Sequence, residues 1–292
     1  MTEHEEFFSS GQQKKTSKSK YRFRRICAVI ILLAFVWWFN NYTLKITKIS
    51  IESPKIKAPV RIAAISDLHA SSHGISNKNI IKKIKKSDPD IVVMLGDMYT
   101  SGSSWDMIQI AVDLTEDIVN EGYPVYFVTG EHDTSEKYIE KIAESGAKVM
   151  NYRSDIINVN GNSLRIMGID NVYYSSTFDL NNAFTIDDSC FNILLAHIPN
   201  YDDFAKFGAD LTLCGDTHGG MVQLPFDLGP VYSSDYGKFF PQLTLKGTTV
   251  YDKGLFNYDG GAMFITSGIG DSPVPVRFNN RPEVAVIDIV PT

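Results

Sequence analysis

The sequence has few cysteines and no excess of positive charge, and each shortage excludes a class of protein. Its 292 residues include three cysteines, Cys27, Cys190 and Cys214, which form neither a paired disulfide framework nor a close-spaced zinc motif. Cys190 and Cys214 are the only two that could pair within a folded domain, and their apolar neighbours favour two buried thiols. The formal net charge of -6 argues against a nucleic-acid partner, because general binders need a basic field to compensate phosphates.

Internal repeats are absent, and the one long apolar run lies near the N-terminus. Residues 1–21 are polar and predict a disordered cytoplasmic tail. Every residue from Ile26 to Phe39 is apolar, and basic residues precede this run. The pattern predicts a single-pass transmembrane anchor over 22–44. The basic residues are expected to hold the N-terminus in the cytoplasm and to leave the rest of the chain outside the cell membrane.

A cleaved signal peptide is the alternative, because the apolar run is shorter than the roughly 20 residues that cross a bilayer. Trp37, Trp38 and Phe39 stand where a cleavage site would need small side chains. The span can also lengthen through Leu44, with Arg24 and Arg25 reaching back to the other interface. These features favour a retained signal-anchor.

The remaining sequence predicts one α/β domain over 60–292, joined to the anchor by a linker at 45–59. Strands expected at 60–66, 90–95 and 125–129 alternate with helices expected at 76–86, 105–120 and 136–145. This alternation predicts parallel βαβ units, whose ligands gather at the carboxyl ends of the strands. Shorter strands follow, with a hairpin at Asn160-Gly161 and a loop-rich stretch at 221–260. We expect two sheets facing each other with helices outside.

Five short motifs carry acids and histidines directly after apolar, β-branched runs. They are Ile65-Ser66-Asp67-Leu68-His69, Leu95-Gly96-Asp97, Thr129-Gly130-Glu131-His132-Asp133, Leu195-Ala196-His197 and Cys214-Gly215-Asp216-Thr217-His218-Gly219-Gly220. A single Asp after a strand usually caps a turn. However, four of the six histidines fall in these motifs, and turn capping by Asp does not explain why histidines gather there. Converging carboxylates and imidazoles can hold two divalent cations, which clamp a phosphoryl group and activate the attacking water.

These motifs, in this order, resemble those of the calcineurin-like metallophosphoesterase superfamily, and in particular its membrane-anchored bacterial phosphodiesterase-like branch. The superfamily signature is Asp-x-His, Gly-Asp, Gly-Asn-His-Asp/Glu, a lone His and Gly-His-x-His. The resemblance covers about Val60 to Thr292. It implies a four-layer α/β/β/α sandwich of two facing mixed sheets, which agrees with the expected element order.

The resemblance also implies roles for individual residues. It implies seven metal ligands, which are Asp67, His69, Asp97, Glu131, His197, Asp216 and His218. Asp97 would bridge the two metals, and His132 would protonate the leaving oxygen or stabilise the developing charge. Glu131 replaces the family's Asn and Asp216 replaces its first His of the last motif. Both keep a coordinating oxygen and make the second site more anionic.

The sequence therefore predicts a dinuclear, metal-dependent phosphoesterase at the outer face of the membrane, either a phosphodiesterase or a pyrophosphatase. The oxygen-rich second site favours Mn²⁺, with Zn²⁺, Fe²⁺ and Mg²⁺ as alternatives. Its location suggests a phosphoester of a lipid or cell-wall intermediate as substrate. Tyr99, Trp105, Tyr173 and Tyr174 are expected near the pocket. The alternative function is a metal-binding or interaction protein whose altered second site no longer turns over.

Overall fold

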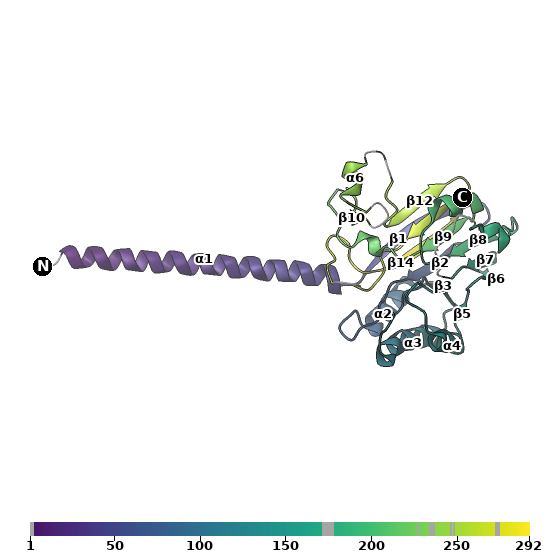
Figure 1. Cartoon of the computed structure of the whole chain (residues 1–292), viewed down its shortest axis with the longest axis horizontal. Helices are drawn as coiled ribbons and strands as arrows, with labels where there is room; N and C mark the ends of the chain where they lie inside the picture. The colour runs from purple at the N-terminus through teal and green to yellow at the C-terminus, as the bar shows by residue number, and fades with distance from the viewer. Residues whose placement is uncertain are drawn as a thin grey trace.

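The structure, a computed structural model, describes residues 3–170, 178–226, 228–233, 237–245, 247, 249–271 and 275–292, with side chains from residue 19 onward. Tyr173 and Tyr174 lie outside these residues. A long N-terminal helix, α1 (Glu3–Tyr42), projects from an α/β domain that contains the rest of the described chain (Figure 1).

Helix α1 includes a segment of 24 residues, Ser19–Tyr42, within which an 18-residue window has a mean hydropathy of 1.6. By length and composition this segment can cross a membrane. The helix also continues back to Glu3, whereas the sequence predicted a disordered tail over 1–21. Lys, Gln and Glu are favourable in helices, and adding residues to an existing helix avoids the cost of a new nucleus.

Two six-stranded sheets face each other in the domain. The order of the first sheet is β1-β14-β2-β3-β4-β5, and its strands are β1 (Lys45–Ser53), β14 (Glu283–Pro291), β2 (Val60–Ile65), β3 (Ile91–Met94), β4 (Val125–Phe127) and β5 (Lys148–Val149). The order of the second is β12-β13-β9-β8-β7-β6, and its strands are β12 (Gly254–Tyr258), β13 (Gly261–Ile265), β9 (Leu211–Cys214), β8 (Phe191–Leu195), β7 (Asn162–Gly168) and β6 (Arg153–Val159). Strands β2, β3 and β4 pair in parallel, as predicted, and β5 adds a further parallel strand.

Helices cover the outer faces of both sheets and complete the four layers. The helical elements are α2 (Asn77–Ser87), α3 (Trp105–Asn120), α4 (Glu136–Glu144), α5 (Tyr201–Phe207), α6 (Pro241–Thr244), η1 (Leu180–Asn182) and η2 (His218–Gly220). Side chains alternate along β2: Ala63 and Ile65 pack in the core with α2, α3 and α4, whereas Ile62 and Ala64 pack in the core between the sheets. This alternation is the two-residue period of a strand buried on both faces. A third core includes Phe204 and Phe207 of α5.

The structure corrects two boundaries. Residues 45–53, predicted as linker, form β1, which pairs in parallel with β14 along its whole length. The domain therefore begins at Lys45, because the alternating residues Ile49 and Ile51 pack against the core between the sheets. Strand β12 lies within 221–260, which was predicted to be loop, and pairs with β13. The hairpin at Asn160-Gly161 is confirmed: it joins β6 and β7, with positive φ at both residues.

Candidate metal centre

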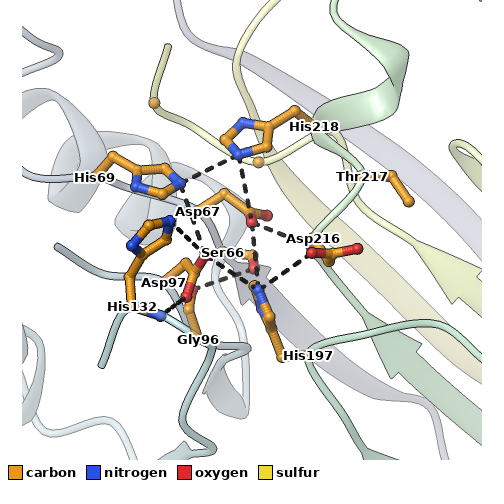
Figure 2. Close-up of polar contacts among 12 residues, drawn as sticks. Ser66, Asp67, His69, Gly96, Asp97, His132, His197, Asp216, Thr217 and His218 are labelled. Atoms are coloured by element: carbon orange, nitrogen blue, oxygen red, sulfur yellow. Dashed lines mark hydrogen bonds and ion pairs between the residues drawn. The ribbon is translucent and has the colours of Figure 1, made fainter. Parts of the chain in front are cut away.

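The predicted site residues lie together where five strands end. Asp67 and His69 follow β2, Asp97 follows β3, and the loop after β4 carries His132. From the other sheet, His197 follows β8, and Asp216 and His218 follow β9. Figure 2 shows these side chains gathered in one cluster on the loops that follow the strands. The carboxyl ends of parallel strands thus bring together residues far apart in the sequence.

Backbone hydrogen bonds continue past the strand ends and fix the loops that carry the site. Asp67 N donates to Gly96 O at 2.9 Å, and His69 N donates to Asp97 O at 3.1 Å. Five of the site residues have left-handed backbone angles: Asp67 (φ 50°), His69 (42°), Asp97 (54°), Asp216 (68°) and His218 (49°). This conformation costs a non-glycine residue roughly 1–2 kcal/mol. Strain concentrated in this way is typical of functional sites.

Two glycines allow the loops after β3 and β4 to approach each other. A Cβ atom at Gly96 would lie 2.5 Å from Gly130 N and 2.8 Å from His197 Nδ1. A Cβ atom at Gly130 would overlap Asp97 Oδ1. Each of these positions therefore excludes a side chain.

Asp97 stands at the centre of the cluster. Its Oδ2 lies 3.3 Å from His197 Nε2, 3.8 Å from His69 Nε2 and 4.0 Å from His132 Nε2. Its Oδ1 accepts a hydrogen bond from His132 N at 2.8 Å. One carboxylate oxygen thus faces three imidazoles, which is the arrangement expected of a ligand shared between two cations.

The donor atoms fit divalent cations. His69 Nε2 and His218 Nε2 lie 3.1 Å apart, and two imidazole nitrogens so placed can both direct lone pairs at one ion. The buried Asp67 Oδ2 has no hydrogen-bond partner among the described residues, and neither does His197 Nε2. His197 Nδ1 lies 2.7 Å from Leu95 O, a bond that orients the ring and leaves Nε2 facing the cluster. Three groups have ligand atoms within 4.8 Å of one another: Asp67, His69 and His218; His69, Asp97 and His132; Asp67, Asp97 and His197.

The two residues that depart from the family signature occupy different places. Asp216 Oδ1 lies 3.8 Å from His197 Nε2 and 32% of its side chain is exposed, so this carboxylate lies beside the cluster but outside the three ligand groups. Glu131 Oε1 lies 3.9 Å from His132 Nε2, and 37% of the Glu131 side chain is exposed. Glu131 therefore stands at the solvent edge of the cluster.

Burial and the charges of neighbouring side chains shift the pKa values of the cluster. Burial lowers the pKa of His69 to about 4 and that of His218 to about 3, and the charge of Arg277 adds to the second shift. Burial also raises the pKa of Asp216 to about 7. Burial would lower the pKa of His197, but Asp97, Asp67 and Asp216 outweigh it and raise this pKa to about 10. The carboxylates thus retain a proton on His197 where a cation would otherwise balance them.

A pH dependence of stability follows for the metal-free protein. The pKa of His197 rises from 6.5 in a model peptide to about 10 in the fold. Its contribution is therefore complete below pH 6.5 and lost as the pH rises through about 10. We expect the chelator-treated full chain to lose up to about 5 kcal/mol of unfolding free energy across this window. Chemical denaturation at a series of pH values measures this, with His197→Gln as control. Equal slopes for both proteins would contradict it.

Two further residues support the site and were not among the predicted ligands. Buried Asp133 accepts hydrogen bonds from Asp97 N (2.7 Å), Gly130 N (2.9 Å) and Met98 N (3.1 Å), and so joins two of the loops. The sequence contains one indication of this role, because Asp133 directly follows His132 in the motif at 129–133. Arg277 is buried, with Nη2 lying 3.5 Å from His218 Nδ1 and donating to Gly270 O at 2.6 Å. No local motif marks Arg277, which follows the second sheet in a loop.

A cavity of about 520 Å³ borders the cluster at His69 and extends to Tyr42 at the end of α1. Thr100, Asp271 and Pro275 also line it. The aromatic residues expected near the pocket lie elsewhere where they are described. Tyr99 is buried against Tyr138, and the Trp105 ring lies 3.7 Å from Lys137 Nζ. Tyr99 packs next to α4, and Trp105 is the first residue of α3. Both side chains therefore serve packing.

Known proteins resemble this chain in sequence and fold. The profile of the calcineurin-like phosphoesterase family matches residues 60–220. The chain is 25% identical over 240 residues to the uncharacterized metallophosphoesterase YkuE of Bacillus subtilis, covering 80% of this chain and 79% of that protein. It is 24% identical over 243 residues to the phosphodiesterase YaeI of Escherichia coli, covering 80% and 83%. Among solved structures, the NAD nucleotidase NadN of Haemophilus influenzae aligns with a TM-score of 0.45 and 19% identity, over 74% of this chain and 46% of that one.

Proposed function

Because this chain belongs to the calcineurin-like phosphoesterase family, we propose that it is a dinuclear metal-dependent phosphodiesterase anchored at the outer face of a membrane. The observation that carries the proposal is the convergence of three overlapping ligand groups on Asp67, His69 and Asp97. Two divalent cations would polarise a phosphoryl oxygen and activate the attacking water at neutral pH.

The seven proposed ligands are Asp67, His69, Asp97, Glu131, His197, Asp216 and His218. Asp67, His69 and His218 would hold one cation, and Asp97 would be shared with the second. Asp216 supports an oxygen-rich second site because its carboxylate lies beside His197. An oxygen-rich site favours Mn²⁺, whereas an imidazole in place of Asp216 would favour metals such as Zn²⁺.

His132 is the proposed proton donor to the leaving oxygen. Ser101 N donates to His132 Nδ1 at 3.1 Å, so the neutral ring carries its proton on Nε2. That atom lies at the cluster, 4.0 Å from Asp97 Oδ2. The backbone bond from His132 N to Asp97 Oδ1 fixes the ring relative to the shared ligand. The geometry thus supports donation from Nε2 to a phosphoryl or leaving-group oxygen.

Replacing His132 tests both the activity and the role. We expect His132→Ala to slow hydrolysis of an aryl phosphodiester by about 10²-fold with Mn²⁺, and His132→Gln, which keeps a donor, to lose less. The same assay with Mg²⁺ and Zn²⁺ tests the metal preference, and lipid-linked and nucleotide substrates test the substrate class.

Metal analysis distinguishes the alternatives, because His132 also belongs to one ligand group. An unchanged metal content in His132→Ala supports the donor role, whereas loss of one equivalent would make His132 a ligand. Equal rates for the variant and the unaltered protein would favour the second candidate, a metal-binding or interaction protein without turnover. The half-exposed Glu131 side chain is the observation that favours this candidate.

We also propose that α1 is retained as a signal-anchor with the N-terminus in the cytoplasm. Asn40 and Asn41 at its end are buried in the domain, so cleavage after Phe39 or Asn41 would remove or disturb packed residues. Arg22, Arg24 and Arg25 precede the apolar run, as the positive-inside rule requires.

A further inference from the structure

Exposed apolar side chains are concentrated on one part of the domain. Among the described residues after Tyr42, eight of the ten exposed large hydrophobic side chains lie within 226–243 and 276–278. The six most exposed, which we call the apolar rim, are Phe226, Tyr232, Phe239, Leu243, Val276 and Phe278. Phe226 is 91% exposed and Phe239 67%. Clustered exposure of this kind marks an interaction surface, whereas isolated exposed apolar residues do not.

The apolar rim includes residues of the loop that joins the end of α1 to the domain. Trp37 Nε1 donates to Pro275 O at 3.0 Å, and Asn279 N donates to Asn40 Oδ1 at 2.9 Å. The segment containing Phe278 pairs in turn with Val222 and Gln223, which lead into the rest of the rim. In Figure 1, β10 (Tyr232–Ser233) and α6 lie on the side of the domain from which α1 extends.

The end of the apolar helix is thus linked through the loop at 275–279 to the segments that carry the rest of the rim. The candidate span ends at Tyr42, within a few residues of the contacts that fix the loop carrying Val276 and Phe278. A bilayer crossed by this span has its interface at the level of the rim. Aromatic side chains are favourable there, because their rings leave water while the adjacent backbone stays near the polar headgroups.

We propose that the apolar rim inserts into the lipid interface of the membrane that α1 crosses, so that the domain lies on the bilayer. This inference rests on the proposed anchoring by α1 and not on turnover. Insertion places the Tyr42 end of the 520 Å³ cavity at the headgroup level and its His69 end at the metal centre. A phosphoester carried by a lipid could then reach the cluster without leaving the membrane.

Site-specific fluorescence in bilayers tests the insertion with the full chain. A Cys27→Ser background leaves the buried Cys190 and Cys214 and accepts an environment-sensitive probe at Phe239→Cys. In nanodiscs that contain brominated phosphatidylcholine, we expect a blue-shifted probe emission and quenching several-fold stronger than at Ile156→Cys. Ile156 is a matched control because it is exposed by 58% on β6, the strand at the far edge of the second sheet.

Two more probe positions make each outcome decisive. Leu243→Cys repeats the measurement should Phe239→Cys fold poorly. Ile31→Cys, within α1, reports whether the helix is in the bilayer. Quenching at position 31 with none at 239 or 243 overturns the rim insertion and leaves the anchoring and the proposed function standing. An absence of quenching at 31 overturns the anchoring and this inference together. A blue shift at 239 without lipid quenching means that a protein surface covers the rim, and also overturns it.

Discussion

Replacing Asp97 by Asn is expected to lower kcat/KM for an aryl phosphodiester by about 10³-fold, which is the upper end of the loss caused by removing one preorganised electrostatic contact. The reason is that one carboxylate oxygen faces the imidazoles of His69, His132 and His197 within 4.0 Å. Asn has nearly the same shape but no charge, so it removes the anionic ligand with little change in packing. Steady-state kinetics with added Mn²⁺ measure the effect.

The control for Asp97→Asn is the stoichiometry of bound metal, measured together with the melting temperature. We expect the folded variant to bind fewer than the two equivalents proposed for the unaltered protein. Asn can still accept the hydrogen bond from His132 N, so the loop geometry should persist. Full activity with unchanged metal content would show that Asp97 is not the shared ligand.

Replacing Asp133 by Ala is expected to have the largest effect on stability. Asp133 accepts three buried backbone N–H groups, from Asp97, Met98 and Gly130. Each orphaned buried donor costs about 1–3 kcal/mol, so the variant should lose about 3 kcal/mol or more of unfolding free energy. Thermal and urea denaturation of the metal-free protein measure this loss.

Asp133→Asn provides the matched comparison. The burial of Asp133 raises its pKa to about 7, so the carboxyl is partly protonated near neutral pH. Removing its charge should therefore cost the protein little unfolding free energy. Asn keeps one carbonyl oxygen for these donors and should therefore be less destabilised than Ala. Asp133 holds the loop that carries Asp97. We therefore expect both variants to bind less metal, and the variant with the more disordered loop to bind the least. Equal stability of Asp133→Ala and the unaltered protein would refute the bracing role.

Much of the fold was predictable because its signals are local. The helix at Trp105–Asn120 matches its predicted bounds, and the helices predicted at 76–86 and 136–145 lie within one residue of α2 and α4. Each has apolar residues at helical spacing with polar residues opposite. Strand β1 was not recognised as part of the domain, because its strand partner is β14, more than 230 residues later in the sequence.

The sequence was enough to identify the residue types that could bind metals and the strand ends that would carry them. An Asp or His directly after a short buried strand must emerge at a sheet edge, and in parallel strands these edges coincide. It likewise determined an apolar N-terminal helix, because an uninterrupted apolar run has few other stable conformations.

Only the tertiary structure decided how these residues meet. It set the 3.1 Å distance between His69 Nε2 and His218 Nε2 and gave Asp133 its three backbone hydrogen bonds. It placed Asp216 near His197 and Glu131 near His132. It also joined the end of α1 to Arg277, whose backbone N donates to Asn41 Oδ1 at 2.7 Å. These contacts link residues on different strands and loops. Their distances depend on how the two sheets pack, a property of the whole domain that no local pattern contains.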